Sequence, residues 1–381
     1  MSEPTQPLRV VAKIGTASIT DASGQISGTA VAQLVDEVAG LRAAGHDVIV
    51  VSSGAVAAGV AALSMESRPT DMRTLQAVSA VGQARLIERY RGEFDRHGII
   101  CAQLLVDSFD FVERSQYLHL RATVNRLLEL GVVPIVNEND AIANDELRYG
   151  DNDRIAALLA NGVGADVLVL LTDMDGLYTA DPRSDPTASL VPLVRSDDPL
   201  LSIRAGVGGS GRGSGGMASK LTAARMASWS GVRSVIARAA RPGVLAGAVS
   251  AELVGTTFEP HVRTLSARKL WIAFAADVVG TVTVDDGARR ALAERGGSLL
   301  PAGIRSVVGR FERGDVVDLV DESSSVFARG RVSIDSRDLT AIIGRRTSEL
   351  PIGTIHEIVH RDDLVVLLGA TSGSGVAEAA G

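Results

Sequence analysis

Only one cysteine, Cys101, occurs among the 381 residues of the chain. A single cysteine excludes an internal disulfide framework and any cysteine-rich zinc site. Cys101 lies in an apolar run, so a packed structural thiol is a better interpretation of it than a nucleophile. Aromatic residues are also scarce, at 3%, which leaves aliphatic side chains to fill the core.

Long apolar runs and a targeting segment are missing as well. No 18 consecutive residues are all apolar, and the first ten lack the basic start and apolar stretch of a signal peptide. We therefore expect a cytoplasmic protein without a membrane span. The net charge of −7 argues against a general polyanion binder, because nucleic-acid affinity rests on clustered Lys and Arg.

Lysine is the rarest of the common charged residues here. The 38 basic residues include only three lysines, Lys13, Lys220 and Lys269. Where Arg fills nearly every basic position, a retained Lys suggests a place that needs a compact ammonium group and not a flat guanidinium. Two of the three, Lys13 and Lys220, stand in glycine-containing contexts typical of phosphate binding.

Short apolar runs alternate with amphipathic segments from residue 8 to about residue 258, and we expect one large domain over residues 1–258. Near-continuous Val, Ile and Leu strands between helices predict an α/β fold with a mostly parallel central sheet and helices on both faces. Ligands of such sheets bind beyond the carboxyl ends of the strands. The expected strands are 8–14, 47–52, 99–105, 132–137, 167–172 and 234–237, and the expected helices are 29–44, 72–97, 116–130, 152–162 and 217–230.

The pattern changes after residue 258. We expect a linker at 259–275, a small, mostly β domain at 276–369 and a disordered tail at 370–381, which is rich in Gly, Ala and Ser. A chain of this length suits one large and one small domain. The expected strands of the small domain are 280–284, 316–320, 326–332, 355–358 and 364–368.

Polar and glycine residues close several of the predicted strands. Lys13-Ile-Gly-Thr closes the first strand, and Ser52-Ser53-Gly54 closes the second, where Ser53 either caps a helix or borders an anion site. Asn137-Glu-Asn-Asp140 and Gly150-Asp-Asn-Asp153 form two clusters of acids and amides. One such cluster alone is best interpreted as helix capping, but two together could bind an ammonium group and a carboxylate.

A glycine-rich stretch, 206–216, precedes the helix that carries Lys220 in its first turn. A lysine there opposes the helix macrodipole unless an anion is present, which favours a phosphate cradle over a linker. The spacing matches neither the P-loop nor the dinucleotide fingerprint. Thr172-Asp173, after a fully apolar strand, could position Mg²⁺, orient the lysines or form a turn.

In this order and spacing, the motifs resemble the glutamate 5-kinase family of the amino-acid kinase superfamily, whose longer members carry a C-terminal PUA domain. The resemblance covers almost the whole chain, although Ala17 stands where the family more often has Ser. It implies ATP-dependent phosphorylation of the γ-carboxylate of L-glutamate, the first step of proline synthesis, with Mg²⁺. It also implies a homo-oligomer and hand-over of the acyl phosphate to a downstream reductase.

The resemblance further implies a role for each matching residue. Lys13 and Lys220 would contact the transferring phosphate, and Asp173 would hold the two ammonium groups. Ser53, Asp140 and Asn152 would bind glutamate. Residues at the ends of two strands and at the start of a helix would bind ATP, namely Lys13, Thr172, Asp173, Ser214, Gly215, Gly216, Met217, Ala218, Ser219 and Lys220. The ligands of the metal stay unassigned.

Two other interpretations remain open. PUA domains commonly bind RNA, but residues 276–369 hold 12 Arg, no Lys and 15 Asp plus Glu, a net charge of about −3, with two aromatic residues, Phe311 and Phe327. RNA is therefore an unlikely partner. The second alternative is another superfamily member, acting on aspartate, acetylglutamate, carbamate or a nucleotide. The amide clusters favour a free amino acid, because they suit an ammonium group.

Overall fold

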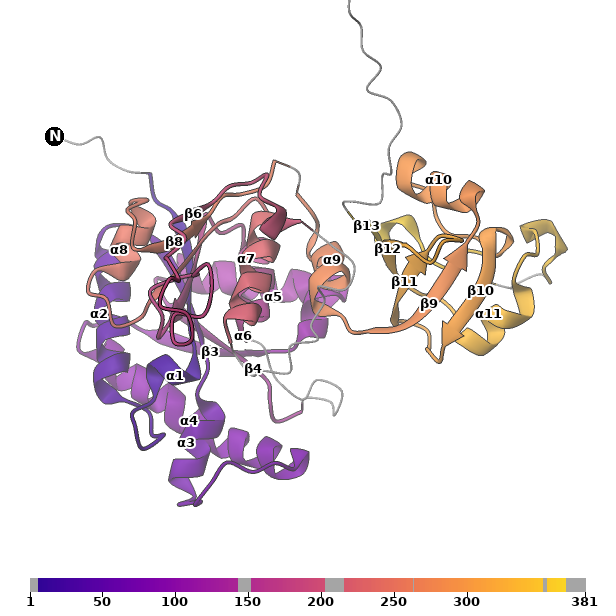
Figure 1. Cartoon of the computed structure of the whole chain (residues 1–381). Helices are drawn as coiled ribbons and strands as arrows, with labels where there is room; N and C mark the ends of the chain where they lie inside the picture. Colours follow the sequence, from indigo (N-terminus) through magenta and orange to yellow (C-terminus); the bar gives the residue numbers. More distant parts are fainter. Residues whose placement is uncertain (1–5, 143–151, 203–215, 263, 352–354, 368–381) are drawn as a thin grey trace, which may run out of the picture. The chain divides into compact units, whose positions relative to one another are not determined.

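The computed structural model describes residues 6–142, 152–202, 216–262, 264–351 and 355–367. The chain divides into two compact units, with the break between Ala267 and Arg268 (Figure 1).

The first unit is built on an eight-stranded sheet in the order β3-β4-β2-β1-β5-β7-β8-β6. Strand β1 lies near the middle and pairs in parallel with both β2 and β5, while β7 and β8 are antiparallel. The mostly parallel sheet expected from the sequence is thus confirmed. The strands are β1 (Arg9–Ile14), β2 (Asp47–Ser52), β3 (Cys101–Val106), β4 (Val133–Glu138), β5 (Val167–Thr172), β6 (Leu193–Val194), β7 (Arg233–Arg238) and β8 (Gly255–Phe258).

Helices cover both faces of this sheet. Helices α2, α4 and α8 pack their apolar side chains into one hydrophobic core with β1, β2 and β5. Helices α5, α6 and α7 pack side by side on the other face (Figure 1). The helices are α1 (Thr16–Ile19), α2 (Gly28–Ala43), α3 (Ala55–Ala62), α4 (Met72–Asp95), α5 (Arg114–Glu129), α6 (Asn152–Val163), α7 (Met217–Ser228) and α8 (Val244–Val249), with 3₁₀ turns at Ser108–Phe111 and Pro199–Leu201.

Local sequence explains the helix that opens the first core. Ser27 caps α2 by accepting a hydrogen bond from the backbone N of Ala30 at 3.3 Å. Apolar side chains at helical spacing, from Val31 to Leu41, are then buried against the sheet. The close agreement with the predicted segment 29–44 follows from this clear signal.

The second unit has a five-stranded sheet in the order β10-β9-β11-β12-β13 and its own hydrophobic core. The mostly β fold is confirmed, but two details of the prediction are wrong. Strand β10 was not expected, and residues 355–358 form no strand, because Ile358 enters the core through an irregular segment bonded to Leu299. The elements are β9 (Val278–Val284), α10 (Asp286–Arg295), β10 (Ile304–Gly309), β11 (Val316–Val320), β12 (Val326–Arg331), α11 (Ser336–Ile342) and β13 (Leu364–Val366), with 3₁₀ turns at Pro301–Gly303, Thr347–Glu349 and Arg361–Asp363.

The segment expected to be a linker is helical in its second half. Helix α9 (Ala267–Leu270) runs into a π-helical turn, η3 (Trp271–Ala275), whose residues are all buried. The buried guanidinium of Arg329 donates to the carbonyl oxygen of Ala273 at 3.0 Å. A linker over the whole of 259–275 is therefore wrong, because its apolar end packs on β12 and β13. The other domain limits stay predictions, and the tail 370–381 lies outside the described residues.

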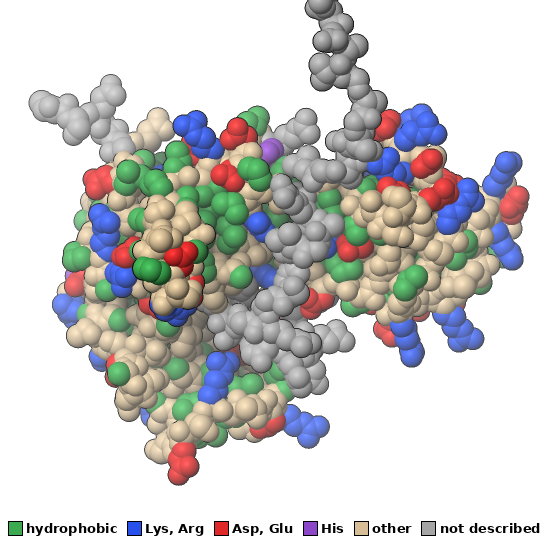
Figure 2. All heavy atoms as spheres, viewed as in Figure 1, with side chains coloured by type: hydrophobic (Ala, Val, Ile, Leu, Met, Phe, Trp, Pro, Cys, Tyr) green, Lys and Arg blue, Asp and Glu red, His purple; other side chains and the backbone are tan. Residues whose placement is uncertain are grey.

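No helix among the described residues is long and apolar enough to cross a membrane. On the face of the second unit visible in Figure 2, acidic and basic side chains are interspersed and do not form a patch of one sign. The two aromatic side chains of residues 276–369, Phe311 and Phe327, are both buried in the core of this unit.

Candidate active site

A cavity of about 920 Å³ opens at the carboxyl ends of the parallel strands of the first unit. This is the edge at which the sequence places its polar strand ends. No histidine is among the described residues that line the cavity. The lining includes side chains at four strand ends and at the starts of α6 and α7, among them Lys13, Ser53, Asn137, Asp140, Asn152, Thr172, Asp173 and Lys220.

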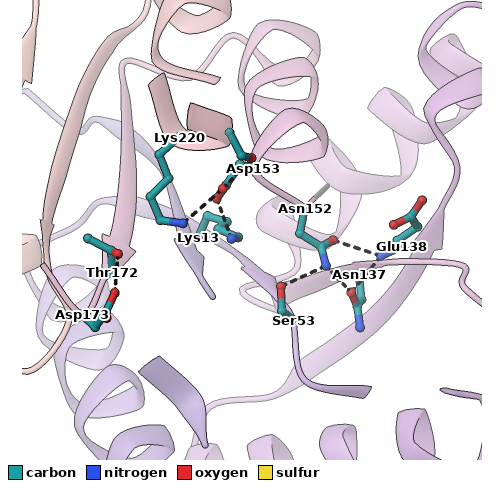
Figure 3. Close-up of polar contacts among 10 residues, drawn as sticks. Lys13, Ser53, Asn137, Glu138, Asn152, Asp153, Thr172, Asp173 and Lys220 are labelled. Atoms are coloured by element: carbon teal, nitrogen blue, oxygen red, sulfur yellow. Dashed lines mark hydrogen bonds and ion pairs between the residues drawn. The ribbon is translucent and has the colours of Figure 1, made fainter. Parts of the chain in front are cut away.

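At one end of the cavity, two lysines share one carboxylate (Figure 3). Lys13 Nζ lies 2.5 Å from Asp153 Oδ1, and Lys220 Nζ lies 3.2 Å from Asp153 Oδ2. The hydroxyl of Ser219 also donates to Asp153 Oδ2, at 2.9 Å. Three segments distant in the sequence, at the end of β1 and the starts of α6 and α7, thus meet at one carboxylate.

All three charged side chains are almost fully buried: Lys13 and Lys220 are each 3% exposed and Asp153 is 0% exposed. Burial by itself raises the pKa of Asp153, but the ammonium groups of Lys13 and Lys220 outweigh burial and hold the pKa below its usual value. Asp153 therefore stays ionised, and this one carboxylate faces two basic side chains. This excess of positive charge, set in a cavity wall, suits an anionic ligand such as a phosphate.

Neutral amides and hydroxyls make the contacts at the other end. Asn152 Nδ2 donates to Ser53 Oγ at 3.1 Å and to Asn137 Oδ1 at 2.9 Å. Asn152 Oδ1 in turn accepts from the backbone N of Glu138 at 3.2 Å. Figure 3 shows that Asn152 points to this amide cluster while its neighbour Asp153 points to the lysines. The start of α6 thus contributes one side chain to each end of the cavity.

Asp140 adds a carboxylate to the lining near the amide cluster. It accepts a hydrogen bond from the Ser79 hydroxyl at 3.0 Å. Burial raises the pKa of Asp140 above its usual value, and this effect exceeds the lowering by the Ser79 hydroxyl and the nearby Arg68 charge. A half-buried carboxylate of this kind gains from a cationic ligand group, which would favour its ionised form.

The turn after β2 requires a glycine. Gly54 has a φ of +110°, and a Cβ there would lie 3.0 Å from Ile26 Cδ1. Helix α3 begins directly after it without a side-chain cap. The interpretation of Ser53 as a helix cap is therefore wrong, because its hydroxyl accepts from Asn152 instead.

The prediction that Asp173 holds the two ammonium groups is also wrong, because Asp153 occupies that place. Asp173 instead accepts from the Thr172 hydroxyl at 3.0 Å, at the end of β5 (Figure 3). Sequence reasoning considered Asp153 only as part of an acidic cluster. The position of Asp153 could have indicated its role. Consecutive residues of a helix point in different directions, so Asp153 faces a different partner from Asn152.

The remaining predicted ATP-binding residues lie around the start of α7. Ser214 and Gly215 are outside the described residues. Gly216 precedes α7 in an extended conformation, and Met217, Ala218 and Ser219 form its first turn. Within the described part of that segment, Lys220 is the residue that reaches the cavity lining.

Comparison with known proteins places this geometry in context. Residues 8–238 match the Amino acid kinase family, and residues 280–352 match the PUA domain. A glutamate 5-kinase of Chromohalobacter salexigens is 45% identical over 364 residues, covering 94% of this chain and 96% of the relative. A glutamate 5-kinase of Myxococcus xanthus is 47% identical over 364 residues, with the same coverage of both chains.

A glutamate 5-kinase of Mycolicibacterium smegmatis is 45% identical over 372 residues, covering 96% of this chain and all of the relative. Among solved structures, an isopentenyl phosphate kinase product complex of T. acidophilum aligns with a TM-score of 0.46 and 18% identity. That alignment covers 66% of this chain and 100% of the other.

Proposed function

The chain belongs to the glutamate 5-kinase family of amino acid kinases, and from that premise we propose how its residues divide the work of the reaction. The chain phosphorylates the γ-carboxylate of L-glutamate with ATP, the first step of proline biosynthesis. The observation that carries the residue assignment is that Asn152 and Asp153, neighbours on one helix, face opposite ends of one cavity.

The lysine end receives the phosphates. Lys13 and Lys220 neutralise charge on the transferring phosphoryl group, and Asp153 holds both ammonium groups in place. Phosphoryl transfer depends mainly on such positioning and electrostatic stabilisation. A γ-carboxylate oxygen bonds to the γ-phosphorus of ATP while the bond from that phosphorus to the β,γ-bridging oxygen breaks, leaving ADP. The acceptor is already ionised, so no general base is required.

The amide end binds the amino acid. Ser53 and Asn152 offer a hydroxyl and an amide to the carboxylates of glutamate, and Asp140 pairs with its α-ammonium group. An N-acetylated substrate lacks that positive charge. The Asp140 carboxylate, whose pKa is raised by burial, would then have no cationic group of the substrate to favour its ionised form. Recognition of the free amino group therefore separates glutamate from N-acetylglutamate.

Mg²⁺ fits this arrangement as an ion that arrives with ATP. No group of three or more His, Cys, Asp and Glu side chains suited to a metal occurs within the described ranges. Mg²⁺ commonly uses one or two carboxylates together with substrate phosphates and water. Asp173, freed from the role of holding the lysines, is the lining carboxylate we propose for it. When bound, the ion would neutralise charge on the phosphates.

We also propose the remaining partners from the chemistry. An acyl phosphate hydrolyses readily in water, so delivery to a downstream reductase would protect the product. A homo-oligomer in the cytoplasm, where ATP and glutamate are both available, stays our expectation. RNA is not among the partners we propose, because both aromatic side chains in 276–369 are buried and cannot stack on bases.

Trapping of the acyl phosphate with hydroxylamine tests this proposal. The purified chain is incubated with ATP, Mg²⁺ and one acceptor at a time: glutamate, aspartate or N-acetylglutamate. Hydroxamate should form with glutamate and not with N-acetylglutamate. Equal turnover of the two would overturn the assignment of Asp140 to the α-ammonium group.

A further inference from the structure

Helix α4 carries a row of polar side chains on the face that it buries. Ser79, Gln83 and Tyr90 recur at helical spacing and all lie inside the protein, although this face otherwise packs apolar side chains. Gln83 Nε2 donates to the carbonyl oxygen of Glu138 at 3.3 Å, and Tyr90 Oη lies 2.9 Å from Ser52 Oγ. Ser79 also donates to Asp140, so the row contacts the end of β2 through Ser52 and the end of β4 and the turn after it through Glu138 and Asp140.

Ser79 is the member of the row that acts on a side chain of the cavity. It is 0% exposed and is not among the described lining residues, so it meets no ligand itself. Its hydroxyl donates to Asp140 Oδ2 at 3.0 Å, and Asp140 does line the cavity. A donor fixed behind a carboxylate limits the orientations of that carboxylate.

The backbone of Ser79 is itself held firmly. Helices α3 and α4 approach so closely that a Cβ at Gly82 would lie 1.7 Å from the carbonyl oxygen of Ala55. A Cβ at Gly59 would lie 1.9 Å from the carbonyl oxygen of Val78, the residue before Ser79. Because α3 begins at the cavity, this contact fixes the Ser79 hydroxyl relative to the turn after β2.

We propose that Ser79 is a positioning residue for substrate recognition, whose hydroxyl orients the Asp140 carboxylate toward the α-ammonium group of glutamate. The proposal rests on the proposed function of Asp140. It goes further in assigning a specificity role to a side chain outside the cavity. The close packing of α3 on α4 holds Ser79 in the position that this role requires.

The test is a double-mutant cycle with Ser79→Ala, Asp140→Asn and the double variant, in the full-length chain. Loss of one hydrogen bond to a charged group typically weakens binding by roughly 10- to 100-fold. Ser79→Ala should therefore raise KM for glutamate about 10-fold or more, with kcat and KM for ATP nearly unchanged. Ser234→Ala, on β7, is the matched control, because Ser234 is equally buried and is not among the residues described as lining the cavity.

If Ser79 acts through Asp140, the Ser79→Ala change should add little to KM for glutamate once Asp140→Asn is present. Additive effects, or a normal KM in Ser79→Ala, would overturn the inference while leaving Asp140 in place. A normal KM in Asp140→Asn would instead overturn the proposed function of Asp140. A fall in kcat and thermal midpoint without a change in KM would show that Ser79 serves only stability.

Discussion

At one end of the cavity three buried charges face one another, whereas at the other end amides and hydroxyls make most of the contacts. Lys13, Asp153 and Lys220 form ion pairs that water screens poorly because they are buried. This end of the cavity therefore interacts mainly with the charge of a ligand. Hydrogen bonds join Asn152 to Ser53 and Asn137. Because hydrogen bonds are directional, this end selects a ligand by where its donors and acceptors lie. The charged end should therefore govern rate, and the amide end should govern the choice of substrate.

Lys220→Arg tests the charged end with the largest expected effect. The charge is kept, but a planar guanidinium cannot occupy the place of a compact ammonium group beside Asp153. Loss of one well-placed stabilising group typically lowers kcat by roughly 10²–10³-fold. Steady-state kinetics and thermal unfolding should be measured with Lys269→Arg as the control, in which little should change. A near-normal kcat in Lys220→Arg would contradict the proposal that the start of α7 binds the phosphates.

Asn152→Ala tests the amide end. Its side chain joins Ser53, Asn137 and the backbone of Glu138, so its loss should raise KM for glutamate by roughly 10- to 100-fold. The effect on kcat at saturating glutamate should be smaller. Asn161→Ala, on the same helix, is the matched control, because that amide bonds to the carbonyl oxygen of Leu265. If kcat falls and KM stays normal, the two ends do not divide the work.

The dependence of KM on pH should also differ between the two ends. Burial raises the pKa of Asp140, so Asp140 loses its charge as the pH falls through that raised value. KM for glutamate should then rise by up to about 10-fold per pH unit on the acid side. The lysines hold the pKa of Asp153 low, so Asp153 stays ionised and its contribution to stability is lost only at lower pH.

KM for glutamate should be measured from about pH 5 to 8, in the wild type and in Asp140→Asn. The variant should lose this dependence, although its KM is raised throughout. The same acid-side rise in both proteins would assign the titration to another group.

Truncation should have the smallest effect, because every residue of both ends lies in the first unit. A chain that ends at Ala267 should keep kcat within about 2-fold, since each domain buries its own core. A chain that ends at Phe258 is the sharper comparison. It loses His261, which stacks on Trp229 at 3.9 Å, and the bond from Leu265 N to Trp229 O, so its thermal midpoint should be lower. Loss of all activity on truncation after Ala267 would show that the catalytic unit depends on the second.

The sequence predicts the central strands well because their signal is strong. Uninterrupted aliphatic runs give the bounds of β2 and β5 without error. Strand β10 is missed because its exposed Arg305 and Ser306 interrupt the apolar pattern. The turn η3 is missed because the flanking Pro, Thr and Arg residues hide a short apolar run, which only tertiary packing makes helical.

The site divides in the same way. Its parts, Lys13, Ser53, Asn152 and Lys220, are found from strand ends and helix starts, since such positions converge at one edge of a parallel sheet. Which carboxylate joins the two lysines is not found, because Asp153 and Asp173 both follow plausible motifs. The choice between them depends on the direction of a side chain in space, which no spacing along the chain specifies.

The most direct test compares Asp153→Asn with Asp173→Asn, each measured for kcat, KM for glutamate and thermal midpoint. Removing the carboxylate between two buried lysines should lower kcat by roughly 10²–10³-fold and lower the midpoint, with a small change in KM. Asp173→Asn should keep a normal midpoint and shift the Mg²⁺ concentration needed for half-maximal rate. A near-normal kcat in Asp153→Asn, beside a large loss in Asp173→Asn, would contradict the account.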